Sequence, residues 1–308
     1  MASTDPSSAP PVSTHSSPTD PRPLSAADLP GCLALSRSAH WNQNEADWRM
    51  MIELGRGWGI EDTADGSRSL AASIVVIPFD GCAWVSMVLV LPQFRRRGFA
   101  GRLLRHALDW LHAHGTLPIL DATPAGYPVY EQAGFVPTWG FQRYRRDAAS
   151  RPPASPVGAA AEGGATRIRA LAPADWPAIL ALDAAALGAS RDPILRRLAD
   201  RLPAAARVAE NAGRVTGFLL GRDGREACQL GPLVAADAGA AQALLDDALA
   251  TIATPVYVDL ADRHEHLDGW LRQRGFAPQR RFTRMVQGTD QKPGDPARMV
   301  LVAGPELG

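Results

Sequence analysis

The sequence predicts an α/β protein built from two domains in tandem. Strand-like, loop and helix-like segments follow one another, most clearly over residues 88–111. The chain has 308 residues, 46% of them apolar, which is enough for two hydrophobic cores. A stretch rich in Ala, Pro, Ser and Gly over residues 148–165 divides it into halves of nearly equal length, as a linker does.

The composition of the chain sets the expected boundaries. Residues near the N-terminus are mostly Ser, Pro, Thr and Ala, and they carry too few large apolar side chains to offset the entropy of ordering. We expect a disordered tail (1–22), an N-terminal domain (23–147), a linker (148–165), a C-terminal domain (166–288) and a loose tail (289–308).

Charge and cysteine content exclude several classes of partner. The formal net charge is zero, which argues against a nucleic-acid-binding surface. Cys32, Cys82 and Cys228 are widely separated, so neither a disulfide framework nor a zinc site is expected. No apolar run approaches the roughly 18 residues of a membrane span. We therefore expect a cytoplasmic protein with no metal, nucleic-acid or membrane partner.

The segment after residue 91 predicts a phosphate-binding loop. An apolar strand leads into three arginines and a glycine, and a helix follows. Gly98 permits a tight turn, and small side chains at Ala100 and Gly101 let backbone N–H groups approach an anion. The loop residues are Arg95, Arg96, Arg97, Gly98, Phe99, Ala100 and Gly101.

The helix after this loop is predicted from its period. Apolar residues recur at three- and four-residue spacing while charged residues fill the other face, so one side packs on a sheet. The apolar positions are Ala100, Leu103, Leu104, Ala107, Leu108 and Leu111.

A second pattern follows a short apolar strand at residues 118–123, where Tyr130, Gly134 and Phe135 form Tyr-x-x-x-Gly-Phe. With the loop pattern Arg-x-x-Gly-x-Ala, the chain resembles the GNAT superfamily of acyl-CoA-dependent N-acyltransferases. The resemblance is strong over residues 24–147 and weak over 166–288. It implies a mixed, mostly antiparallel sheet flanked by helices in each domain, with acetyl-CoA as co-substrate.

The two halves repeat one pattern at an offset of about 141 residues, a shift that aligns Gly98 with Gly239, Gly134 with Gly275 and Arg143 with Arg284. At this offset the three loop arginines align with Ala236, Asp237 and Ala238, and Tyr130 aligns with Leu271. A carboxylate repels a pyrophosphate, and leucine has no proton to donate. We infer a catalytic first copy and a degenerate second copy, as in bacterial GNAT proteins with a degenerate C-terminal repeat.

The resemblance assigns catalytic roles by position. It implies that the strand Val88, Leu89 and Val90 diverges from its neighbour and offers backbone groups to the pantetheine arm. It places Tyr130 beside the thioester sulfur as the general acid, with Tyr127 as a competing candidate. Packing of the Tyr130 ring against Phe135 is the structural alternative.

The general base is Asp121 in this interpretation, because it ends a strand in a mostly apolar setting that raises a carboxyl pKa. An ordinary turn at Asp121, with deprotonation through water, is the alternative.

The acceptor site is expected in the N-terminal helices, where two tryptophans stand among polar groups. The substrate-binding candidates are Trp41, Asn42, Glu45 and Glu53, with Gln43 also polar. Alternatively Trp48, Met51 and Ile52 form the apolar stripe of a helix. The sequence thus predicts an N-acetyltransferase acting on a primary amine of a small molecule; a protein or peptide N-acetyltransferase and a non-catalytic acyl-CoA sensor are the alternatives.

Overall fold

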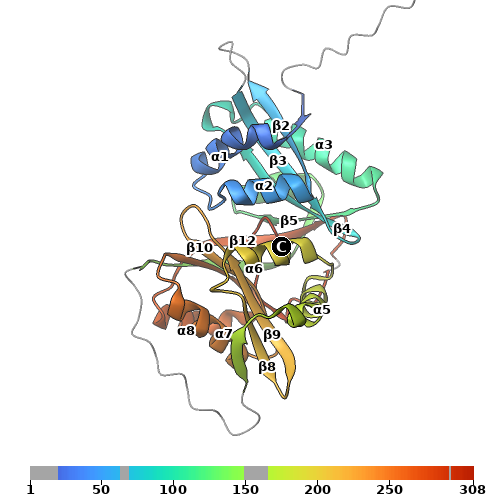
Figure 1. The fold of residues 1–308 in the computed structure, drawn as a ribbon. Helices are drawn as coiled ribbons and strands as arrows, with labels where there is room; N and C mark the ends of the chain where they lie inside the picture. The colour runs from blue at the N-terminus through green and yellow to red at the C-terminus, as the bar shows by residue number, and fades with distance from the viewer. Residues whose placement is uncertain (1–19, 63–68, 149–165, 291–292) are drawn as a thin grey trace, which may run out of the picture.

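The computed structural model describes residues 20–62, 69–148, 166–290 and 293–308. The strands of these residues form one 13-stranded sheet in the order β1-β2-β3-β4-β5-β12-β6-β11-β13-β10-β9-β8-β7 (Figure 1). Only β4–β5 and β10–β11 are parallel among the strand pairs described. The predicted mixed α/β class with a mostly antiparallel sheet is confirmed, although one sheet runs through both halves.

The first half contains the elements that the sequence places around the loop. They are β1 (Arg22–Pro23), α1 (Leu29–Ser38), α2 (Glu45–Leu54), β2 (Arg56–Asp62), β3 (Ser69–Pro78), β4 (Cys82–Val90), α3 (Phe99–Ala113), β5 (Leu117–Ala122), α4 (Tyr127–Gln132) and β6 (Phe135–Arg146). The predicted apolar face of α3 is buried against the sheet.

The second half repeats this order. Its elements are β7 (Arg167–Ala170), α5 (Trp176–Leu187), α6 (Asp192–Arg201), β8 (Arg207–Asn211), β9 (Arg214–Arg222), β10 (Cys228–Ala235), α7 (Ala238–Thr251), β11 (Val256–Ala261), α8 (Asp268–Gln273), β12 (Ala277–Gln287) and β13 (Met299–Leu301). The helices α4 and α8 stand at the predicted offset. Each is followed by a left-handed glycine, Gly134 at φ 83° and Gly275 at φ 81°, so the repeat is structural.

The halves exchange one long strand each. β12 lies between β5 and β6 of the first half, and β6 lies between β12 and β11 of the second. In register, Arg284 on β12 faces Asp121 on β5, while Arg143 on β6 faces Asp259 on β11. Both arginines bind their carboxylate through two hydrogen bonds, at 2.9 and 3.0 Å for Arg284 and 2.7 and 2.7 Å for Arg143. Two ion pairs of the same kind therefore join the halves, one at each exchanged strand.

One hydrophobic core also crosses the boundary between the halves. It runs from Trp48 on α2 through Phe141 and Phe282, whose rings stack at 5.0 Å, to Leu195 on α6. On the opposite face of the sheet, α3 covers a core of the first half, whereas α7 and α8 cover one of the second. Within the described residues, no helix is long and apolar enough to cross a membrane.

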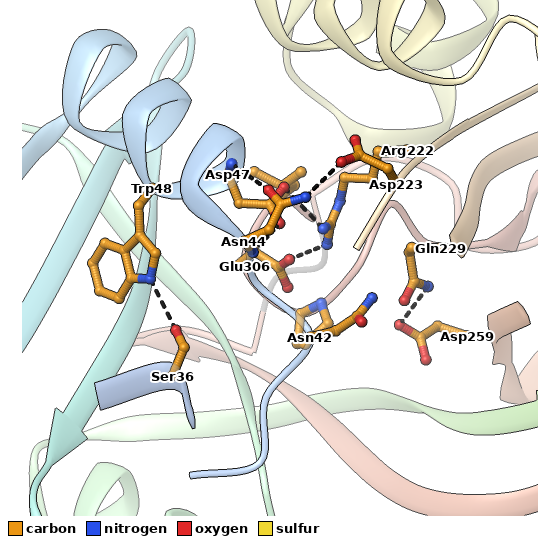
Figure 2. A network of polar contacts seen from close by, with 12 residues as sticks. Ser36, Asn42, Asn44, Asp47, Trp48, Arg222, Asp223, Gln229, Asp259 and Glu306 are labelled. Atoms are coloured by element: carbon orange, nitrogen blue, oxygen red, sulfur yellow. Dashed lines mark hydrogen bonds and ion pairs between the residues drawn. The ribbon is translucent and has the colours of Figure 1, made fainter. Parts of the chain in front are cut away.

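A buried polar network adds to this boundary (Figure 2). Asn44 and Asp47 form a capping box at the start of α2. The Asp47 carboxylate lies 2.9 Å from Arg222 on β9, which also pairs with Glu306 near the end of the chain (Figure 2). Each of these three side chains is at most 2% exposed. Loss of one partner leaves a buried charge uncompensated, so the network fixes how the halves meet.

Two predicted boundaries need correction. The expected loose tail is wrong for its final part, because β13 is buried in the sheet and Ala303 and Leu307 have no exposed surface. The apolar residues at positions 299–303 drive this burial, and the end marked C lies between the halves (Figure 1). At the other end, Arg22, the last residue of the expected N-terminal tail, belongs to β1 and pairs with Gly59 on β2. Residues 1–19 and 149–165 lie outside the described residues.

Candidate active site

The loop between β4 and α3 has the geometry of an anion-binding site. Arg96 (φ 62°) and Gly98 (φ 77°) have positive φ values, so the backbone turns sharply before α3. Gly98 is the N-cap of α3 and provides no side chain to cap its first turn. The space around Gly98 and Gly101 is open, since an added Cβ meets no atom within 4 Å. A ligand can therefore approach the positive end of the helix.

The three arginines of this loop add positive charge. Arg95, Arg96 and Arg97 are exposed. The Arg95 Nε lies 3.4 Å from the Val90 carbonyl oxygen, and the Arg97 guanidinium lies 5.2 Å from the centre of the Phe94 ring. Among the described residues, no carboxylate forms an ion pair with any of the three. Their charge is thus available to a phosphate group.

Beside this loop, β4 diverges from β5 and carries a bulge. The parallel pairing ends at Trp84 and Ile119. On the other edge of β4, the register with β3 shifts, because Met87 and Val88 together face one residue. Met87 has φ 53°, and Ser73 Oγ donates a hydrogen bond to its carbonyl oxygen at 2.8 Å. The divergence expected for the strand Val88–Val90 is present.

The aromatic side chains of α4 lie near this divergence. Val88, Val90, Tyr127 and Tyr130 are partly exposed and pack on the same core beneath α3. The Tyr130 and Phe135 rings meet edge to face at 6.1 Å, as the packing alternative requires. Burial raises the pKa of Tyr130 to about 12, so its hydroxyl keeps its proton at neutral pH. A donor role and a packing role are both compatible with this position.

Asp121 occupies a different environment from the one a general base needs. Its side chain is fully buried, and both oxygens accept hydrogen bonds from Arg284. Burial raises the pKa of the carboxyl, and the Arg284 guanidinium opposes this shift. A carboxylate with both oxygens held by a guanidinium presents no free oxygen to an amine. The geometry favours a structural role for Asp121, which holds β12 against β5.

Two of the four acceptor candidates contact the second half and line a small cavity there. The Asn42 amide accepts hydrogen bonds from the backbone N–H groups of Glu226 and Ala227 and donates one to the Ala227 carbonyl. Trp41 packs partly buried on the shared core. Both residues line the cavity between the halves. Asn42 therefore serves as a docking contact, with its hydrogen-bonding groups already in use.

The other two candidates lie on the surface of α2. Glu45 forms an exposed ion pair with Arg49, one turn along the helix. Glu53 forms one with Arg197 on α6 of the second half. Trp48 and Met51 have no exposed surface, which confirms the alternative interpretation of this segment as the apolar stripe of a helix.

The corresponding loop of the second half satisfies its own backbone. Asp237 is the N-cap of α7, and its carboxylate accepts a hydrogen bond from the Ala240 N–H at 2.8 Å. The side-chain carboxylate thus stands where an anion stands at an uncapped helix N-terminus. Leu271, at the place of Tyr130, is buried.

The divergence of β10 and β11 is filled by β13. Leu301 pairs with Leu233 on β10 and with Leu260 on β11, so the chain itself fills the gap between the strands. The β10 bulge consists of Gly231 and Pro232, and proline has no N–H to offer a ligand. The second half keeps the fold of the site without its openings.

Sequence reasoning missed two features beside β4, one on this strand and one on β12 of the second half. Ser86, directly before the bulge, is 7% exposed, and its hydroxyl has no hydrogen-bond partner within the described part of the chain. It lies two residues beyond the last β4–β5 pair, as Asp121 does on β5. The Arg284 guanidinium lies between the Trp84 and Trp139 rings, 4.4 and 4.2 Å from their centres. A lone serine in an otherwise apolar strand was the signal available for Ser86.

Comparisons with known proteins agree with this geometry. Residues 20–138 and residues 179–299 each match a family model described as an acetyltransferase (GNAT) domain. The uncharacterized N-acetyltransferase YitH of Bacillus subtilis (strain 168) is 23% identical over 247 residues, which are 80% of this chain and 83% of YitH.

Solved structures show the same fold over almost the whole chain. A putative acetyltransferase from Pyrococcus horikoshii aligns with a TM-score of 0.75 and 16% identity over 97% of this chain and 99% of its own. A GCN5-related N-acetyltransferase from Sphaerobacter thermophilus aligns with a TM-score of 0.65 and 17% identity, over 93% of this chain and 100% of its own. A tandem GNAT protein from the clavulanic acid biosynthesis pathway aligns with a TM-score of 0.60 and 16% identity, over 87% of this chain and 97% of its own. The chain belongs to the GNAT superfamily and is an acetyltransferase with two GNAT domains in tandem.

Proposed function

We propose that the first GNAT domain transfers an acetyl group from acetyl-CoA to a primary amine of a small molecule. The contrast between the halves carries this proposal: the first has an unpaired basic loop beside an open strand divergence, and the second has both places filled. Free Cys32 and Cys82 thiols suit a reducing compartment, so we place the reaction in the cytoplasm.

The residues of the first half fit acetyl-CoA. The loop arginines and the N–H groups at the start of α3 bind the pyrophosphate, and the open space at Gly98 and Gly101 accommodates it. The diverging edge of β4 offers backbone groups to the pantetheine arm. When bound, acetyl-CoA supplies the activated thioester.

The side chains near the divergence divide the remaining roles. A backbone N–H at the Met87–Val88 bulge stabilises the negative charge that develops on the thioester oxygen. Tyr130 gives its proton to the departing thiolate. Because Arg284 holds both oxygens of Asp121, the amine loses its proton to water, and the Ser86 hydroxyl orients the amine or that water.

Calorimetric titration of acetyl-CoA tests the cofactor site. Wild type should bind one molecule per chain, and Gly98→Glu should abolish binding because it places an anion in the basic loop. Gly98→Asn is the matched control, since asparagine tolerates the left-handed conformation without adding charge, and it should still bind. Binding that survives Gly98→Glu would move the site elsewhere.

Thiol release then separates the three functional classes. Turnover with small amines but not with peptide N-termini or lysine-containing peptides supports the proposed class. Turnover confined to peptides would replace it with a protein N-acetyltransferase. Binding without turnover of either class would indicate a sensor.

A further inference from the structure

A small cavity lies at the junction of the two halves, away from the loop at α3. It is formed by the connection between α1 and α2, by strands β6, β11 and β12, and by Pro305 from the final segment. Its lining is His40, Trp41, Asn42, Gln43, Arg143, Tyr257, Gln279, Arg280, Phe282 and Pro305. Because both halves contribute, the cavity exists only in the assembled tandem.

The charge of this cavity is unbalanced. Its lining holds two guanidiniums, of Arg143 and Arg280, and no carboxylate. Arg143 is neutralised from behind by Asp259 at 2.7 Å. Arg280 is partly buried and has no ion-pair partner among the described residues. Among the described residues, Arg280 therefore has no carboxylate in direct contact, and Glu226 and Asp259 act on it only at longer range.

The position of Arg280 makes this imbalance costly. It faces Arg143 directly across the β12–β6 pair, and like charges at opposed positions repel. Burial and the neighbouring Arg143 charge lower the pKa of Arg280. A bound carboxylate would offset the repulsion, since it meets a guanidinium through two parallel hydrogen bonds.

A second polar group also lacks a partner. Gln43 is 2% exposed and lines the cavity, and its Oε1 accepts no hydrogen bond from the residues that the structure describes. Buried polar atoms are nearly always satisfied by protein, water or ligand. The nearby Tyr257 hydroxyl is already engaged by Arg145, Glu226 and Gln279, so it leaves Gln43 unmet.

The size of the cavity limits what enters it. Its volume is about 20 Å³, and a single water needs at least roughly 10–15 Å³ on this measure. Only the end of a ligand fits inside, and exposed His40 marks the rim through which the remainder extends. A planar carboxylate meets this limit better than a tetrahedral phosphate.

We propose that the junction cavity binds the carboxylate of a small molecule, with Arg280 as its ion-pair partner and Gln43 Oε1 accepting from an adjacent N–H or O–H of the ligand. The carboxylate belongs either to the acceptor amine or to a separate ligand that joins the halves. The geometry of β12 allows the first source. Arg280 stands four residues, about 13 Å along the strand, from Arg284 beside the strand divergence, so one acceptor can reach from the cavity to the divergence.

Fluorine NMR of trifluoroacetate tests binding without acetyl-CoA, so its outcome is independent of the proposed function. Wild type should broaden the trifluoroacetate signal, and acetate, but not chloride at equal ionic strength, should reverse the broadening. Arg280→Gln should weaken trifluoroacetate binding by about tenfold or more. This variant removes an unpaired charge and should melt no lower than wild type.

Arg281→Gln is the matched control. Arg281 is the next residue of β12, and its exposed side chain pairs with Asp262 instead. It should bind trifluoroacetate as wild type does. Absence of broadening in wild type, or equal loss in both variants, would overturn the proposal.

Acetylation of paired acceptors identifies the source of the carboxylate. The ω-amino acids of increasing length are compared with the corresponding alkylamines in wild type, Arg280→Gln and Arg281→Gln. A lower KM for the amino acids that disappears only in Arg280→Gln, at unchanged kcat, assigns the carboxylate to the acceptor. Equal KM values in both series, with trifluoroacetate binding intact, assign it to a separate ligand.

Discussion

The loop after β4 and the loop after β10 hold matching places in the two GNAT domains, yet one is open and the other is closed. In the second domain, Asp237 caps α7 and β13 pairs with both diverging strands. Backbone N–H and C=O groups must be satisfied whether or not a ligand binds. At both of these places the second domain supplies the partners from its own chain.

Breaking either of the two ion pairs between the halves should have the largest effect, a loss of stability that compares the two domains directly. Asp121→Asn and Asp259→Asn each leave a buried arginine without its carboxylate, and each should lower the free energy of unfolding by about 3–5 kcal/mol in urea titrations. Because we assign Asp121 no proton transfer, turnover per folded molecule should be similar in the two variants. A far larger loss of turnover in Asp121→Asn would restore it as the general base.

Tyr130→Phe tests the proposed general acid, at whose position the second domain has the buried Leu271. We expect kcat to fall about 100-fold or more at neutral pH, within the range of general acid catalysis. Thiol release at saturating acetyl-CoA measures this. Full turnover in the variant at every pH between 6 and about 9 would leave Tyr130 with a packing role only.

The raised pKa of Tyr130 also predicts a pH dependence of stability. The folded value is about 12 and the ordinary value is 10, so burial of the neutral phenol stabilises the protein fully below pH 10. This contribution is lost as the pH rises from 10 toward 12. Tyr144 shifts in the same direction, to about 12, so the test is the difference between wild type and Tyr130→Phe. The alkaline loss of stability should be smaller in the variant.

Gly231→Ala probes the closed divergence. Gly231 has φ 140°, and an added Cβ would lie 2.0 Å from the Val302 carbonyl oxygen. The clash should displace the final segment and cost about 1–3 kcal/mol of unfolding free energy. Gly269→Ala in α8, which meets no atom within 4 Å, is the control and should be neutral or stabilising by up to about 1 kcal/mol.

Arg95→Ala and Asp237→Ala compare the two helix N-termini. Arg95→Ala should weaken acetyl-CoA binding about 10- to 100-fold, the worth of a charge-assisted hydrogen bond. Asp237→Ala should leave that affinity unchanged and lower stability by about 1 kcal/mol, because it removes a cap. The opposite result in calorimetry would exchange the roles of the two domains.

Ser86→Ala gives the smallest effect. The hydroxyl has no partner in the fold, so its removal should leave stability unchanged or raise it. If the hydroxyl orients the acceptor, activity should fall by up to about tenfold. Leu230 precedes the bulge in the second domain, where the structure requires no polar group. Unchanged kcat and KM would remove Ser86 from the site.

Features with a local origin could be predicted from the sequence. The loop and α3 follow from a glycine, an apolar period and a helix start within a short stretch, and the repeat follows from equal spacing. The strand divergence came from family resemblance, and the bulge at Met87 was not predicted, because both depend on partners that spacing does not reveal.

Features with a distant partner could not be predicted. Arg284 stands 163 residues after Asp121, and no local pattern marks the pair, so Asp121 was assigned a chemical role. The backbone partners of Asn42 lie 185 residues further along the chain in the case of Ala227, so its contact with the second half could not be predicted either. The buried run at 299–303 is short and follows a polar stretch, so its composition alone resembled a tail.

The exchange of β6 and β12 has a consequence for synthesis of the chain on the ribosome. When the first domain emerges, β5 and β6 have no partner between them, because β12 has yet to be translated. Their edges are then open templates for pairing with other chains. A nascent chain that stops at the linker lacks the strand that pairs with both β5 and β6, so the first domain can reach the strand order of the finished protein only after β12 has left the ribosome.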